Sequence, residues 1–107
     1  MKFNKMRDDN RAHYVAFIAW LKDSAAASLR SVRGDPVLMR SAIDEYLKSG
    51  YEAGLTSGEL TDFFCVDTPN ILDRAGYSEA EAAEAVAVYD QINTVYCRSM
   101  LRAGKNP

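Results

Sequence analysis

The side chains best suited to acid–base or nucleophilic chemistry are few in this 107-residue chain. His13 is the only histidine, and Asp9 stands four residues before it, on the same face if a helix has already begun. A carboxylate partner can orient an imidazole ring, but no serine or cysteine lies at a spacing that implies a nucleophile. We therefore interpret His13 as a surface histidine near a helix-capping acid, and we predict that the protein is not an enzyme.

Metal and phosphate motifs are also missing from the sequence. Cys65 and Cys97 lie far apart and belong to no Cys-x-x-Cys motif, and one histidine with two distant thiols does not make a zinc site. The acids lack the spacing of a calcium loop, and no glycine-rich phosphate loop is present. We predict no metal and no cofactor, and we expect both cysteines to be buried free thiols.

Capping residues and apolar spacing indicate which elements hold these side chains. The first predicted helix follows possible caps at residues 8–10 and ends at Gly34, and the second runs from Asp35-Pro36 to Gly50. A short helix begins at the Thr56-x-x-Glu59 capping box and passes Phe64, and another opens at Asp67-Thr68-Pro69 and stops at Gly76. The Ser78-x-x-Glu81 capping box opens a long last helix that ends near Arg102.

These elements predict an all-α fold, a compact helical bundle of about five helices with a long C-terminal helix. The length suits a single domain over residues 1–107, with frayed ends near 1–7 and 103–107. No apolar run is long enough to cross a membrane. The basic start is followed by Asp8, Asp9 and Asn10 where a signal peptide would be apolar, so we expect a cytoplasmic protein without membrane contact.

Charge is unevenly distributed along the chain. Residues 55–90 hold eight acids and one base, Arg74, which gives −7, whereas residues 1–54 sum to +2 and residues 91–107 to +3. A concentrated negative field attracts a basic protein and repels nucleic acid. The candidate partner-binding residues are therefore the acids Asp62, Asp67, Asp73, Glu79, Glu81 and Glu84.

The segment 59–76 resembles the helix-turn-helix of DNA-binding regulators. Its apolar and small positions are matched by Leu60, Thr61, Phe64, Val66 and Ile71. Cys65 replaces the usual turn glycine, and Arg74 stands where an apolar residue is expected. The would-be recognition helix offers Asp67, Asn70 and Asp73 with a single base, Arg74, and this acidic balance opposes contact with phosphates.

The first helix carries more apolar surface than one stripe requires. Tyr14, Phe17, Ile18 and Leu21 cluster within one face, and Val15 and Trp20 fall on its flanks. Two interpretations of Trp20 stay open: it belongs to a helix buried on several sides, or it is an interface anchor. We add Trp20 to the candidate partner-binding residues.

These observations together lead to a hypothesis about function. We expect a non-enzymatic protein-binding protein, a monomer or homodimer, that docks its acidic segment on a larger protein with a basic, nucleic-acid-handling surface. In size, composition and lack of motifs the chain is similar to anti-CRISPR inhibitors of phages and mobile elements, and an immunity protein against a nuclease toxin fits equally. The alternative is a small helix-turn-helix regulator that dimerises through its last helix.

Overall fold

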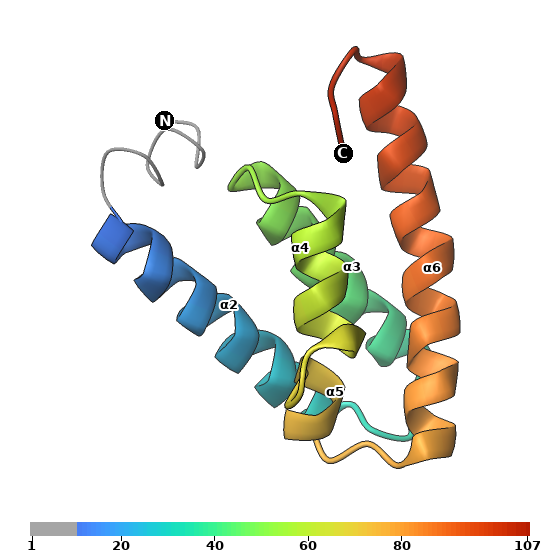
Figure 1. Ribbon diagram of the computed structural model, residues 1–107. Helices are drawn as coiled ribbons and strands as arrows, with labels where there is room; N and C mark the ends of the chain where they lie inside the picture. Colours follow the sequence, from blue (N-terminus) through green and yellow to red (C-terminus); the bar gives the residue numbers. More distant parts are fainter. Residues whose placement is uncertain (1–10) are drawn as a thin grey trace.

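The computed structural model describes residues 11–107, which form helices and no strand (Figure 1). The elements are α2 (Arg11–Ser31), α3 (Pro36–Glu52), α4 (Ser57–Thr61), the π-helix η1 (Asp62–Val66), α5 (Ile71–Arg74) and α6 (Glu79–Arg102). The prediction of a compact all-α fold of five α-helices with a long last helix is confirmed. The caps and the fraying predicted within residues 1–10 lie outside the described residues.

The long helices are arranged around α3. A short turn joins α2 to α3, so these two helices form an antiparallel hairpin, and α6 runs beside α3 on its other side (Figure 1). In this view α2 and α6 lie at opposite edges of the molecule, and α4, η1 and α5 occupy the space between them. None of the helices in residues 11–107 is long and apolar enough to cross a membrane.

Local capping sets three of the helix starts as predicted. The Asp35 carboxylate accepts hydrogen bonds from the backbone N–H groups of the first turn of α3, and Pro36 takes the first helical position. Thr56 with Glu59 and Ser78 with Glu81 form complete capping boxes at α4 and α6. These contacts span three residues, so the sequence alone is enough to predict them.

Two predicted boundaries are wrong. Gly50 does not stop α3, which continues to Glu52 and ends before Gly54, a glycine in the left-handed region at φ +91°. Gly50 is instead a buried residue inside the helix. The second error is at α5, which begins at Ile71 with Asn70 as its cap.

The segment predicted to open α5 has another role. Asp67 ends η1, and the Thr68–Pro69 peptide bond is cis. Because Asn70 is the cap residue of α5, Pro69 lies before the cap instead of at the first helical position. Asn70 and Asp73 then form a capping box that the sequence prediction missed. The result is a helix of only four residues.

The core lies where α2, α3, α6 and the short helices meet. Its largest fully buried side chains are Leu29, Ile43, Leu47, Leu60, Phe64, Ile71 and Tyr89. The Phe64 ring stacks on Tyr89 with centroids 4.4 Å apart and lies 5.8 Å from Tyr46, which joins η1 to α6 and α3. At the other end, the tail for which we predict fraying turns back, and the Pro107 carbonyl accepts a hydrogen bond from the Ser57 N–H at 2.7 Å.

Candidate functional site

Two of the candidate acids are engaged within the protein. The Arg33 guanidinium donates to both carboxylate oxygens of Glu81, Nε to Oε2 at 2.7 Å and Nη2 to Oε1 at 2.6 Å. Glu81 also accepts from the Ser78 backbone in its capping box. The hydrogen bonds from Arg33 hold the pKa of Glu81 at about 2. Asp73 likewise accepts a hydrogen bond from the Asn70 N–H. Both carboxylates therefore stabilise the fold of this chain.

Four other acids are exposed: Asp62, Asp67, Glu79 and Glu84. Within residues 11–107 no side chain forms a hydrogen bond or an ion pair with their carboxylates. They are therefore the candidate acids that keep their negative charge available to a partner.

The Cys65 thiol of η1 is affected by acids of both η1 and α6. Burial raises the pKa of Cys65, and the nearby negative charges of Asp90 and Asp62 raise it further. Asp62 belongs to η1 and Asp90 to α6, so carboxylates of both helices act on this thiol. Cys65 is consequently held as a thiol, which is a poor nucleophile at neutral pH.

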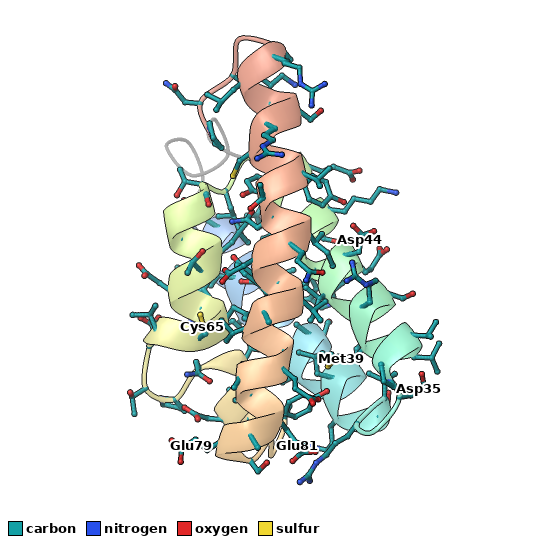
Figure 2. The ribbon with its side chains drawn as sticks, turned by 90° about the vertical axis from the view of Figure 1, so that its right-hand side faces the viewer. Asp35, Met39, Asp44, Cys65, Glu79 and Glu81 are labelled. Carbon is teal, nitrogen blue, oxygen red and sulfur yellow. The ribbon has the colours of Figure 1, made fainter. Side chains whose placement is uncertain are left out.

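We call Asp62, Asp67, Glu79 and Asp90 the acidic face. Glu79 and Asp90 are eleven residues apart, about three helical turns, and so share one stripe of α6. Figure 2 shows Cys65 and Glu79 on the same side of α6, opposite Asp35, Met39 and Asp44 of the α3 side. The side chain of Val66 is 61% exposed within η1, between the two aspartates that begin and follow this helix. Our site prediction omitted Asp90 and Val66, although the helical spacing of Asp90 from Glu79 would have found the first.

Glu84 and Trp20 lie apart from the acidic face. Glu84 is seven residues from Gln91, which lines the groove between α3 and α6, so it belongs to the flank of α6 nearest α3. Trp20 is on α2, at the opposite edge of the molecule from α6 (Figure 1). The structure thus does not bring the seven predicted residues into one site.

The indole of Trp20 is not part of the core. It is 55% exposed, its ring centroid lies 5.7 Å from that of Phe17, and it borders a groove of about 180 Å³ between α2 and α3. The groove is lined mainly by small side chains, including Ser24, Ser28 and Ser49. The interpretation of Trp20 as a buried residue is wrong.

A polar cluster joins α3, α4 and α6 near the second cysteine. Tyr51 donates to Asn93 Oδ1, Asn93 Nδ2 donates to Ser57 Oγ at 3.0 Å, and the Cys97 sulfur lies 3.8 Å from Ser57 Oγ. Burial raises the pKa of Tyr51 to about 12, so its hydroxyl remains protonated at neutral pH. Neither the Tyr51 phenol nor the Asn93 amide can act as a base toward Ser57 or Cys97. We therefore interpret the cluster as a structural junction between the three helices.

The other chemical candidates are dispersed. His13 is exposed on α2, and Cys65 and Cys97 are half-buried free thiols. Over residues 11–107, no three histidine, cysteine or acidic side chains come close enough together to hold a metal ion.

The helix-turn-helix resemblance has little support from the geometry. The segment that would be the recognition helix is α5, whose four residues rise only about 6 Å, too short to follow a DNA groove. Its one base, Arg74, donates to the Asp23 carboxylate of α2. Comparison with known protein families, curated proteins and solved structures gives no match for this chain.

Proposed function

We propose that this chain is a non-enzymatic binding protein that docks its acidic face on the basic surface of a larger, nucleic-acid-handling protein. It would inhibit that protein by occupying the surface, in the manner of an anti-CRISPR or immunity protein. The observation that carries the proposal is the set of exposed carboxylates on η1 and α6, none of which is paired with a cation among the described residues.

The acids of residues 55–90 divide into those that cap helices and those that do not. Helix capping accounts for Glu59, Asp73 and Glu81, which all accept hydrogen bonds at helix starts. Capping does not account for Asp62, Asp67 and Asp90, which hold no cap position at the N-terminus of a helix. A basic partner could therefore pair with these three carboxylates without disturbing a helix cap.

Val66 gives the acidic face an apolar contact. Protein interfaces combine an apolar centre that excludes water with a charged rim that steers association. An exposed valine bordered by Asp62 and Asp67 has this arrangement on a small scale. The expected partner surface carries lysines and arginines around a shallow apolar depression.

The test compares two variants with the same change in charge. Asp62→Lys/Asp67→Lys reverses two of the four acids of the acidic face, whereas Glu45→Lys/Glu52→Lys reverses two exposed acids of α3. Association with a panel of purified CRISPR effector nucleases and basic nuclease toxins is followed by surface plasmon resonance, and inhibition by nucleic-acid cleavage. We expect the first variant to bind its target about tenfold more slowly at low salt, with the difference shrinking as salt is added.

The control variant should bind nearly as fast as the wild type. Equal association of wild type and the Asp62→Lys/Asp67→Lys variant at low salt would exclude docking through this face. Retardation of duplex DNA by the wild type, with no inhibition of any nuclease, would favour the regulator alternative instead.

A further inference from the structure

The flank of α6 turned toward α3 carries a second pattern of charge. Figure 2 looks onto α6, with Asp44 of α3 on one side and Cys65 on the other. One stripe follows this flank at alternating intervals of four and three residues: Glu84, Val88, Gln91, Val95, Arg98 and Arg102. All of these side chains are exposed except Val88, which is half-buried.

The stripe borders an apolar groove between α3 and α6. The groove has a volume of about 530 Å³, with Ile92, Val95 and Tyr96 on its α6 side. Val95 is 65% exposed, and Val37, one turn before Arg40 of the α3 rim, is 74% exposed. Val37 of α3 and Val95 of α6 are therefore apolar side chains that the monomer leaves exposed to water.

The charges of the stripe reverse from one end to the other. Glu84 lies near the start of α6, and Arg98 and Arg102 lie near its end, with Glu84 and Arg98 about 21 Å apart along the axis. An antiparallel copy of α6, related by a two-fold axis at Gln91, would place each Glu84 opposite the partner's Arg98. A parallel copy would place like charges together, so the stripe complements itself only in the antiparallel orientation.

We propose that this flank is a homodimer interface in which the α6 helices of two copies pair antiparallel. Val95 then lies near the two-fold axis, where its side chain and the α3–α6 groove are covered by the second copy. The interface goes beyond the proposed function, because it uses the flank of α6 opposite Cys65 (Figure 2), whereas Asp62 and Asp67 lie at the two ends of η1, the helix that carries Cys65. It also gives Glu84 a role in self-association in place of the partner-docking role predicted from the sequence.

A charge swap tests the antiparallel pairing without any other protein. Sedimentation velocity of the wild type at low salt over a wide concentration range should show reversible monomer–dimer association. Glu84→Arg and Arg98→Glu should each weaken the dimer about tenfold, since each change creates two repulsive contacts per dimer. The double variant Glu84→Arg/Arg98→Glu restores opposite charges and should return the dissociation constant to near the wild-type value.

Two exposed valines provide the matched control. Val95→Arg should abolish the dimer, whereas Val66→Arg, at a comparably exposed valine on the other side of α6, should leave it intact. Circular dichroism of each variant confirms that the helices are retained. A wild type that stays monomeric at every concentration, a double variant as weak as the single ones, or equal effects of the two valine changes would overturn the proposal. Val66 borders the acidic face, but every readout is the monomer–dimer equilibrium of this chain alone, without the basic partner, so the two proposals fail independently.

Discussion

Gly50 of α3 lies directly against Leu60 of α4, so closely that a Cβ atom on Gly50 would be 2.3 Å from Leu60 Cδ2. Leu60 is completely buried, and Gly50 lies within the last turn of α3, although glycine is an unfavourable residue inside a helix. The close approach of the two helices explains why glycine is needed at this position.

Gly50→Ala should destabilise the fold by about 1–3 kcal/mol, because the added methyl group forces Leu60 or the backbone to move. Gly58→Ala is the control, since a Cβ there has only Thr56 Oγ1 at 4.0 Å as a neighbour and alanine favours the helix. Urea unfolding of both variants measures the difference. If Gly50→Ala is as stable as the wild type, the packing of α3 on α4 is looser than described.

The Arg33–Glu81 pair predicts a stability change in acid. The pKa of Glu81 is lowered from 4.5 to about 2 in the folded protein, so its contribution is present above pH 4.5 and is lost as the pH falls from 4.5 to 2. Glu81→Gln should therefore be less stable than the wild type at neutral pH and converge with it near pH 2. Glu79→Gln, which removes an exposed acid of the same helix turn, should show a smaller difference at neutral pH. Urea unfolding at a series of pH values tests both variants, and a Glu81→Gln deficit that persists unchanged at pH 2 would contradict the role of the ion pair.

Trp20→Ala should cost little stability, about 0.5 kcal/mol, because more than half of the side chain is already in water. Leu21→Ala, one residue further along α2, should cost about 2–5 kcal/mol, because Leu21 is 2% exposed. Thermal or urea unfolding compares the two. Native fluorescence provides a second check, since an emission maximum typical of buried tryptophan would disagree with the exposed indole.

Tyr46→Phe should lower stability by about 1 kcal/mol. The Tyr46 hydroxyl donates to the Leu60 carbonyl at 2.6 Å inside the core, where no water can replace it, and burial raises the pKa of this hydroxyl. Tyr96→Phe is the comparison, since the Tyr96 hydroxyl donates to Asp44 Oδ1 at 2.9 Å in a half-buried position that water can reach. Equal losses for the two variants, measured by urea unfolding, would mean that burial adds nothing to the Tyr46 hydrogen bond.

The sequence by itself determined the helical fold and three helix starts. Asp35, the Thr56–Glu59 pair and the Ser78–Glu81 pair act over two or three residues, so their geometry follows from local backbone hydrogen bonding. The unequal distribution of charge along the chain is likewise a property of the sequence.

Only the tertiary structure decided which acids remain available and what several residues do. Glu81 is neutralised by Arg33, which is 48 residues away in the sequence. The local pattern predicts that Gly50 ends a helix, whereas its actual role is to allow the close approach of Leu60. Trp20 is exposed although its helix supplies core residues on the neighbouring stripe. These outcomes depend on contacts between distant segments, and local periodicity and capping carry no information about which segments will meet.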